Sequence, residues 1–410
     1  MSPRSIDGRA LYERALQLAF PRYSGTEGDE RAITLVRSWF EDAGLEVSEE
    51  RFSYDVRPAF RALRILLLAS AAGVVAATAL GAAHPFVGLA VLATVWIAAA
   101  TFPGWAPWLE RIYRHDGPVE TANVVGVVAD RRKDRRYRMT VIVLAHHDSK
   151  SQNLTLPYRA AFTAGALVGS LAVGACLIVR VAGGALPVAA ISSSSAVAGL
   201  SLLALSTLRS GNRSPGGVDN AGSVAIVAEL ARSLPALVPE DVELIFLSPG
   251  AEEDHMVGAM RWLDRHRSEL AAREVYALNL DGAGIAGPVV LLERYGFGRL
   301  FSERLSCLSR LAAADLGLEV RASLLPPAMG VDAIPFAHRG IDCLTLASGS
   351  LCPAVAAVHS ARDRGENLNP DALERVARLA VEVIVRLAER GAAPDQAGSK
   401  SAATPRSDPE

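Results

Sequence analysis

The chain has 410 residues, enough for one large or two ordinary domains, and its formal net charge is −2. The near balance of 42 basic and 44 acidic residues gives no reason to expect a polyanion, so nucleic acid is not predicted as a partner. The four cysteines form no CxxC pair, which argues against a zinc knuckle or a disulfide framework, and the 50% share of hydrophobic residues is high for a soluble protein.

The N-terminal residues 9–56 have a soluble character. LYERALQLAF (11–20) and DERAITLVRSWFEDAG (29–44) carry apolar positions at the period of a helix. LEVSEERFSYD (45–55) alternates as a β-strand does. We therefore expect two helices followed by a strand.

Most of the hydrophobic excess lies in four nearly uncharged runs. Each is close to the roughly 20 residues that cross a bilayer. Buried core helices rarely lack charge over such a length, and the small residues of the fourth run are tolerated where membrane helices pack closely. We predict four transmembrane helices in two hairpins, at about 65–83, 86–102, 160–179 and 188–208.

The rest of the chain alternates between short apolar runs and helix-period segments. This alternation predicts an α/β domain with a mixed, mostly parallel sheet sandwiched by helices. The expected strands are 122–128, 139–145, 241–248, 275–280 and 343–348, and the clearest helices are 222–234 and 373–390.

The sidedness of the hairpins is predicted from the basic residues that flank them. Nine such residues lie at the ends that face the soluble domain, whereas only Arg180 lies at a hairpin tip. The positive-inside rule then places the soluble domain in the cytoplasm. The nine are Arg57, Arg61, Arg64, Arg111, Arg114, Lys150, Arg159, Arg209 and Arg213.

The strand at 139–145 runs directly into His146-His147-Asp148. Functional groups gather at the carboxyl ends of parallel strands, and residues two apart on an extended chain share a face. We therefore expect Asp148 to hold the imidazole of His146, with His147 on the opposite side. This motif is a weak signal when it stands alone.

Four further sites, which contain five residues, strengthen it. Asp219 lies in a Gly-rich turn before a helix, Glu252 and Glu253 follow the strand at 241–248, Asp281 follows the strand at 275–280, and His359 precedes the C-terminal helix. Singly they could be a helix cap, a solvated acidic loop, a turn residue and a surface histidine. Together they form a ligand set that suits a divalent metal such as zinc.

These motifs, in this order, resemble the co-catalytic di-zinc aminopeptidases of metallopeptidase family 28, whose relatives include glutamate carboxypeptidases and glutaminyl cyclases. The resemblance covers about 10–56, 119–156 and 209–391, and it includes PRYSGTEGDERAITLVRSWFEDAG (21–44). It implies two Zn²⁺ ions that activate a water molecule, one held by His146 and Asp281 and the other by Glu253 and His359. It further implies that Asp219 bridges the ions, that Asp148 orients His146, and that Glu252 is the general base.

The resemblance also accounts for the spacing of the motifs. His146 and Asp219 are 73 positions apart, and removing the hairpin region 157–208 leaves a link of 21. Both hairpins therefore look like insertions into loops of one catalytic domain. The expected segments are catalytic-domain residues 1–60, 105–156 and 209–392, hairpins at 61–104 and 157–208, and a disordered tail at 393–410.

The functional expectation is a membrane-anchored zinc exopeptidase, most simply an aminopeptidase acting on peptides. Two alternatives stay open, namely glutaminyl cyclase-like acyl transfer with one zinc and a non-enzymatic membrane scaffold. Because the second hairpin begins nine residues after Asp148, we also expect the catalytic mouth to lie near the bilayer.

Overall fold

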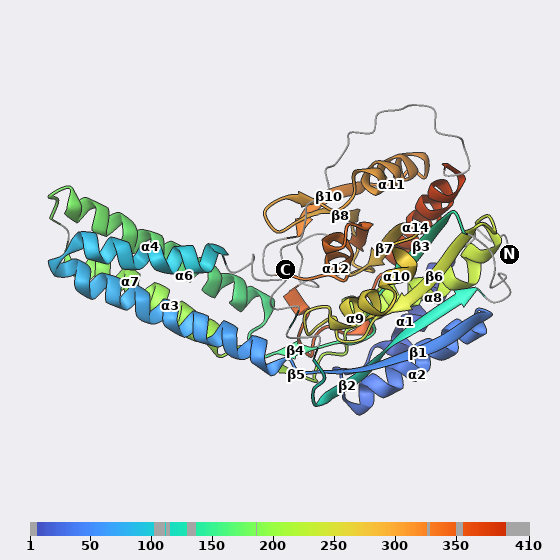
Figure 1. Ribbon diagram of the computed structural model, residues 1–410, viewed down its shortest axis with the longest axis horizontal. Coiled ribbons are helices and arrows are strands. Elements are labelled where there is room, and N and C mark those ends of the chain that lie inside the picture. The colour runs from blue at the N-terminus through green and yellow to red at the C-terminus, as the bar shows by residue number, and fades with distance from the viewer. Residues whose placement is uncertain are drawn as a thin grey trace.

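The computed structural model describes residues 6–101, 111, 115–128, 137–185, 187–325, 329–349 and 356–390. It has two parts, an α/β domain and a bundle of long helices that projects from it (Figure 1). The predicted tail at 393–410 and the flanking Arg114 lie outside the described residues.

The α/β domain is built on one mixed sheet with the strand order β1-β2-β6-β3-β7-β11-β8-β10, and β9 pairs with β8. Its four central strands, β6, β3, β7 and β11, are parallel, while β1, β2 and β8 run antiparallel to their inner neighbours. A two-stranded pair, β4 and β5, lies apart. The strands are β1 Leu45–Tyr54, β2 Val119–Val128, β3 Met139–Leu144, β4 Ser151–Gln152, β5 Ser210–Gly211, β6 Val242–Ser248, β7 Glu274–Leu280, β8 Val289–Tyr295, β9 Arg299–Leu300, β10 Val320–Leu325 and β11 Asp342–Ser348.

Helices cover both faces of this sheet. One face packs against α1, α2, α8, α11 and α14 through a large apolar core, and the other packs against α9, α10 and α12. The mixed α/β sandwich predicted from the sequence is thus present. These helices are α1 Gly8–Leu18, α2 Glu27–Asp42, α8 Gly222–Ser233, α9 Val257–Arg265, α10 Arg267–Leu270, α11 Glu303–Asp315, α12 Ala333–His338 and α14 Pro370–Arg390, with short helical turns at Gly217–Ala221, Leu234–Ala236 and Gly365–Asn367.

The projecting bundle contains α3 Arg57–Ala83, α4 Pro85–Thr101, α6 Leu156–Val181 and α7 Val188–Ser206. α3 packs against α4 and α7, and α6 packs against the same two helices. Small residues bring the first two helices together: a Cβ added at Gly88 of α4 would lie 2.6 Å from the carbonyl oxygen of Ala77 and 2.8 Å from the Cα of Gly81. The bundle is therefore a closed, tightly packed unit.

The outer surface of the bundle is apolar. Large side chains such as Ile65, Leu167 and Leu200 are more than half exposed on it. Three of its helices, α3, α6 and α7, are long and apolar enough to cross a membrane, and α4 is a shorter apolar helix of 17 described residues. The second predicted span, at about 86–102, is thus apolar and helical, and its described part is shorter than the other three helices.

Candidate metal centre

The predicted metal ligands begin at the carboxyl ends of three adjacent parallel strands. Leu144 at the end of β3 pairs with Leu247 of β6 on one side and with Asn279 of β7 on the other. The chain segments that leave these strands carry His146, the Glu252-Glu253 pair and Asp281. The register of the sheet therefore brings residues 135 positions apart to one edge.

A first group of possible ligands consists of His146, Asp219 and Asp281. The Nε2 atom of His146 lies 3.2 Å from Oδ1 of Asp219 and 4.0 Å from Oδ1 of Asp281. This Nε2 is buried and makes no hydrogen bond within the described residues. The three side chains thus direct their donor atoms at a common point.

A second group consists of Asp219, Glu253 and His359. The Nε2 atom of His359 lies 3.2 Å from Oδ2 of Asp219 and 3.0 Å from Oε2 of Glu253. Asp219 therefore offers one carboxylate oxygen to each group. The ligand atoms within each group lie within 4.8 Å of one another.

The backbone around Asp219 is shaped to present this carboxylate. Gly216 has the left-handed φ of 59°, and a Cβ there would lie 2.5 Å from the carbonyl oxygen of Asp219. The carboxylate of Asp363 then accepts hydrogen bonds from the backbone N–H groups of Val218 and Asp219, at 2.9 and 3.2 Å. Asp363 thus holds the turn through its backbone, and the side chain of Asp219 faces both His146 and His359.

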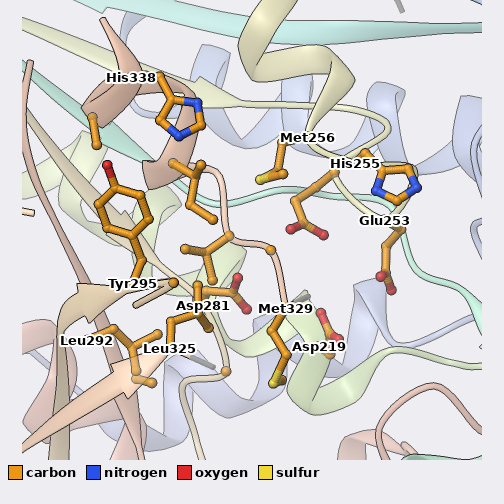
Figure 2. A pocket seen from close by; sticks show the side chains of 18 of the residues that line it. Asp219, Glu253, His255, Met256, Asp281, Leu292, Tyr295, Leu325, Met329 and His338 are labelled. Carbon is orange, nitrogen blue, oxygen red and sulfur yellow. The ribbon is translucent and has the colours of Figure 1, made fainter. Parts of the chain in front are cut away.

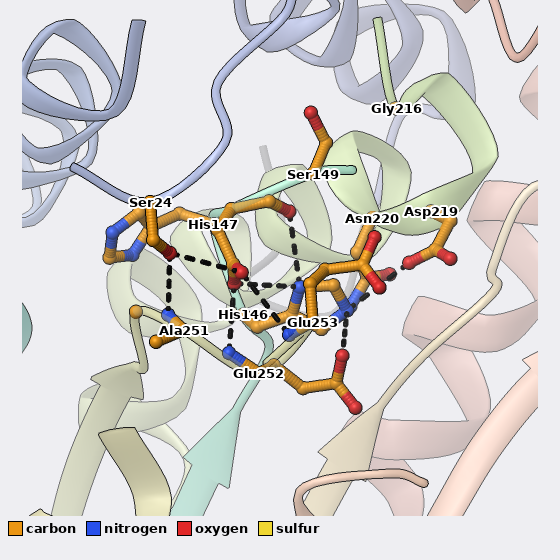
Figure 3. A network of polar contacts seen from close by, with 12 residues as sticks. Ser24, His146, His147, Ser149, Gly216, Asp219, Asn220, Ala251, Glu252 and Glu253 are labelled. Carbon is orange, nitrogen blue, oxygen red and sulfur yellow. Dashed lines mark hydrogen bonds and ion pairs between the residues drawn. The ribbon is translucent and has the colours of Figure 1, made fainter. Parts of the chain in front are cut away.

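Asp148 contacts His146 as the spacing predicted, and it also holds the loop of Glu252 and Glu253. Figure 3 shows this loop beside His146. Its Oδ1 lies 3.3 Å from Nδ1 of His146. The same carboxylate accepts hydrogen bonds from the backbone N–H groups of Glu252 and Glu253, at 3.1 and 3.2 Å. Asp148 therefore fixes the position of a ligand from β3 and of the loop after β6 together.

His147 lies on the opposite side, also as predicted. Its Nδ1 is 3.2 Å from the carbonyl oxygen of Ser248, and its Nε2 is 3.5 Å from Oδ1 of Asp29 in α2. All these groups are fully buried or nearly so. His147 thus ties the strand end to the N-terminal helices and takes no part in the ligand groups.

Glu252 is an acidic residue of the cavity lining that belongs to neither group. Burial, together with the carboxylates of Asp332 and Asp281, raises the pKa of Glu252 well above its usual range, although His146 opposes the shift. Burial likewise raises the pKa of Asp281 to about 7. Such shifts show that this pocket concentrates negative charge away from water, which is the environment that a bound cation would neutralise.

Arg22 is a central residue that the sequence analysis did not single out, although it lies in the quoted N-terminal motif. Its guanidinium is fully buried and donates to the backbone carbonyls of Phe20, His147, Pro215 and Gly216. These carbonyls belong to three separate segments of the site. No sequence pattern marked this arginine, because its partners are all backbone atoms.

Lys150 and Asp332 were also not predicted as part of the site. The Nζ of Lys150 lies 2.9 Å from Oε2 of Glu253. Asp332 is fully buried, and neither of its carboxylate oxygens has a hydrogen-bond partner among the described residues. Burial raises the pKa of Asp332 to about 8. Both residues lie next to the predicted ligands and general base and are visible only once the fold is known.

A large cavity of about 2150 Å³ contains the centre. Asp219, Glu253 and Asp281 face it, with Leu292, Tyr295 and Leu325 on the side of Asp281 and His255 on the side of Glu253 (Figure 2). Ligand pockets usually measure about 300–1,000 Å³. The cavity therefore has room for a substrate much larger than one amino acid.

The donor set fits divalent zinc. Each group combines one imidazole nitrogen with carboxylate oxygens, which are ligands that zinc accepts, and the two groups share one carboxylate. The two groups together contain three carboxylates and two histidines in a buried pocket, and the carboxylates supply the negative charge that dications need. The residues predicted from the sequence are thus gathered in an arrangement that can hold two ions.

Comparison with known families identifies the C-terminal part of the chain. Residues 193–384, just under half of the sequence, match the family described as Peptidase family M28. Aminopeptidase YwaD of Bacillus subtilis (strain 168) is 27% identical over 179 residues, which cover 42% of this chain and 37% of that protein. The match thus spans little more than a third of that relative's length. The family resemblance inferred from the motifs is confirmed.

Comparison with solved structures supports the fold over nearly the whole chain. A structure of BSAP, a zinc aminopeptidase from Bacillus subtilis, has a TM-score of 0.56 at 14% identity and covers 95% of this chain and 97% of its own. An aminopeptidase from Aneurinibacillus sp. strain AM-1 has a TM-score of 0.54 at 15% identity, with coverages of 93% and 94%. A glutaminyl cyclase from an Acidobacteriales bacterium has a TM-score of 0.53 at 14% identity, with coverages of 95% and 97%.

Proposed function

Because residues 193–384 match Peptidase family M28, we propose that this chain is a membrane-anchored zinc aminopeptidase that hydrolyses N-terminal residues of peptides. The observation that carries the proposal is the pair of ligand groups that share Asp219. In the proposed assignment His146 and Asp281 would hold one zinc, Glu253 and His359 would hold the other, and Asp219 would offer one carboxylate oxygen to each. The names of the relatives support an aminopeptidase over other hydrolases.

The two ions would polarise the scissile carbonyl and lower the pKa of the attacking water. Glu252 supplies the proton transfer: its carboxylate takes a proton from the attacking water and delivers it to the leaving amine as the C–N bond breaks. Glu252 suits this role because it lines the cavity 3.7 Å from Nε2 of His146 without joining either ligand group. Its backbone is held by Asp148, so the carboxylate is positioned by the element that orients His146.

We further propose that the bundle crosses a lipid bilayer and that the α/β domain lies in the cytoplasm. The exposed apolar side chains of the four helices support insertion, because a water-facing surface of this kind is unfavourable. The basic residues Arg57, Arg61, Arg64 and Arg209 at the domain end of the bundle support the orientation. Labelling of intact cells with a membrane-impermeant thiol reagent would test this orientation in the Phe86→Cys and Leu316→Cys variants. Only the cysteine at position 86 should react from outside.

The test of the proposed function is Glu252→Gln in the full chain, purified in detergent. The amide cannot accept the proton, so turnover of leucine p-nitroanilide should fall at least 10³-fold, roughly the contribution of a general base. Bound zinc, measured by elemental analysis, should stay at two ions per chain. Activity equal to that of the parent protein would refute the assignment of Glu252.

Glutaminyl cyclase-like acyl transfer is the second candidate, because glutaminyl cyclases share the fold. It predicts cyclisation of N-terminal glutaminyl peptides, with one tightly bound zinc per chain. Assaying glutaminyl and leucyl peptides on the same preparation separates the two candidates. The two complete ligand groups favour hydrolysis with two ions.

A further inference from the structure

The domain end of the bundle reaches the cavity that contains the metal centre. The cavity is lined at the start of α3, at the end of α4, at the start of α6 and just after α7. The lining residues at these positions include Phe60, Leu63, Thr101, Leu156, Arg159 and Leu208. The domain end of the bundle is therefore one wall of the cavity, and this wall is mostly apolar.

The wall lies at the level where the lipid-facing surface of the bundle begins. Leu63 lines the cavity, while Ile65, two residues further along α3, is 67% exposed on the outside of the bundle. Two residues correspond to about 3 Å along a helix axis. Arg64 is exposed between them and donates from Nε to the carbonyl oxygen of Ser206, at 3.1 Å. An arginine at this height marks the polar boundary of a bilayer.

The wall is also joined directly to the ligand loops. The ring of Phe60 lies 5.7 Å from the ring of His255, which follows Glu253 by two residues. Arg159 donates to the side-chain oxygen of Gln152 at 2.7 Å, and the backbone N–H of Gln152 donates to the carbonyl oxygen of His359 at 2.9 Å. A chain leaving the metal centre on the side of Glu253 and His359 therefore passes onto the apolar wall.

We propose that this wall binds an alkyl chain, so that the substrate is an amphiphile with an α-aminoacyl or short peptide head whose amide nitrogen carries a long apolar chain. The inference rests on the proposed function and names its substrate class. An aminopeptidase holds only one residue on the acyl side of the scissile bond, so any long group must lie on the leaving-amine side. Water adds across the C–N bond: its hydroxyl goes to the acyl carbon and its remaining proton goes to the released amine.

A slender alkyl chain fits this wall better than the transmembrane helix of a protein substrate. The described helices close into a ring, since α3 and α6 each pack against both α4 and α7. A helix with its side chains is about 10 Å across and would need a groove between them. An alkyl chain needs only the surface that the helix ends already present to the cavity.

The first test is a chain-length series. Leucine amides of butylamine, octylamine and dodecylamine are assayed with the zinc-loaded full chain in lipid nanodiscs. We expect kcat/KM for the dodecylamide to exceed that for the butylamide at least tenfold. The Leu63→Gln variant should reduce this ratio at least threefold, whereas Ile65→Gln, the same kind of change on the outside of the same helix, should leave it unchanged.

The second test measures binding without turnover. Metal-free protein in nanodiscs is irradiated with a leucine dodecylamide that carries a diazirine at the end of its alkyl chain, and the labelled peptides are mapped. Labelling at Phe60, Leu63 and Leu156 should be suppressed by excess unlabelled dodecylamide. Labelling confined to lipid-facing positions such as Ile65, insensitive to the competitor, would overturn the proposal.

The outcomes separate this inference from the proposed function. If kcat/KM does not depend on chain length although the butylamide is hydrolysed, the proposed amphiphilic substrate is wrong and the proposed aminopeptidase activity is still supported. A higher kcat/KM for a polypeptide with a transmembrane segment than for the dodecylamide would also overturn it. Failure to hydrolyse any amide with zinc bound would overturn the proposed function, whereas suppressible labelling of the wall would still support an alkyl site.

Discussion

Asp148 holds two parts of the centre with one carboxylate, since it contacts His146 and accepts from the backbone of Glu252 and Glu253. The two backbone N–H groups donate to different oxygens, and in the Asp148→Asn variant one of these oxygens becomes an NH₂ group, which cannot accept its bond. We expect zinc affinity to fall about 10- to 100-fold, as it does when such supporting groups are changed. Competition with a chelator measures this, and Asp116→Asn, on an exposed carboxylate, is the control. Equal affinities would contradict the supporting role.

Arg22 stabilises the site through backbone carbonyls from three segments. The Arg22→Met variant keeps much of the volume but leaves several buried carbonyls without a donor. Each such loss costs about 1–3 kcal/mol, so the free energy of unfolding should fall by at least about 3 kcal/mol. Chemical unfolding in detergent measures it. The matched control is Arg37→Met, an exposed arginine paired with Glu41, which should change stability little.

At the scale of single residues, the sequence was informative where a histidine or a carboxylate follows the end of a predicted strand. The strand periodicity and the motif resemblance identified all the residues of the two ligand groups, and the structure brings them together. Arg22, Lys150 and Asp332 were not predicted as parts of the site, because no local pattern links them to it. An arginine that donates only to carbonyls, or an aspartate without partners, has no local pattern.

At the scale of elements, the end of α9 is joined to β1 by His266, whose Nε2 lies 2.7 Å from Oε1 of Glu50. The hydrogen bond to Glu50 raises the pKa of His266 above its usual 6.5. Its stabilisation is therefore fully present below pH 6.5 and is lost as pH rises through the raised folded-state pKa. The loss of stability in His266→Gln should be about 1 kcal/mol at pH 5.5 and smaller at pH 9, measured by chemical unfolding. A pH-independent difference would contradict the ion pair.

The helix bundle depends on close approach between α3 and α4. A Cβ at Gly88 would lie 2.6 Å from a backbone oxygen, so Gly88→Ala should lower the thermal unfolding temperature of the bundle in detergent. Gly199→Ala is the matched control, because its Cβ would meet only Val75 at an ordinary 3.8 Å. Alanine is favoured over glycine in a helix by about 1 kcal/mol, so the control should be neutral or more stable. The reverse order would contradict the observed packing.

Elements with a strong local pattern were predicted well, and those fixed by long-range pairing were not. The five expected strands of the central sheet and the N-terminal strand are present within one or a few residues. β8 and β10 were missed. β10 is largely exposed, and its pairing with β8 is set by the sheet and not by its own alternation.

For the whole molecule, metal binding should contribute to the stability of the fold. Burial is the main cause of the raised pKa values of Asp281 and Asp332, and repulsion from neighbouring carboxylates raises them further. Bound cations would relieve this repulsion. Removing zinc with a chelator should lower the free energy of unfolding of the α/β domain, and zinc at about 100 times its Kd should restore about 2.7 kcal/mol. Differential scanning calorimetry with and without zinc measures it. A transition that does not respond to zinc would count against a structural metal centre.

The first hairpin separates two strands that must pair. β1 ends at Tyr54 and its antiparallel partner β2 begins at Val119, with α3 and α4 between them. During synthesis the edge of the sheet therefore stays open until the intervening helices have found their own environment. If that environment is the bilayer, the hairpin of α3 and α4 must be inserted during synthesis, before β2 and the rest of the sheet have been made. Formation of the hydrolytic centre is then coupled to membrane insertion. A chain that is not inserted can complete its sheet in the cytosol only with an apolar hairpin exposed to water.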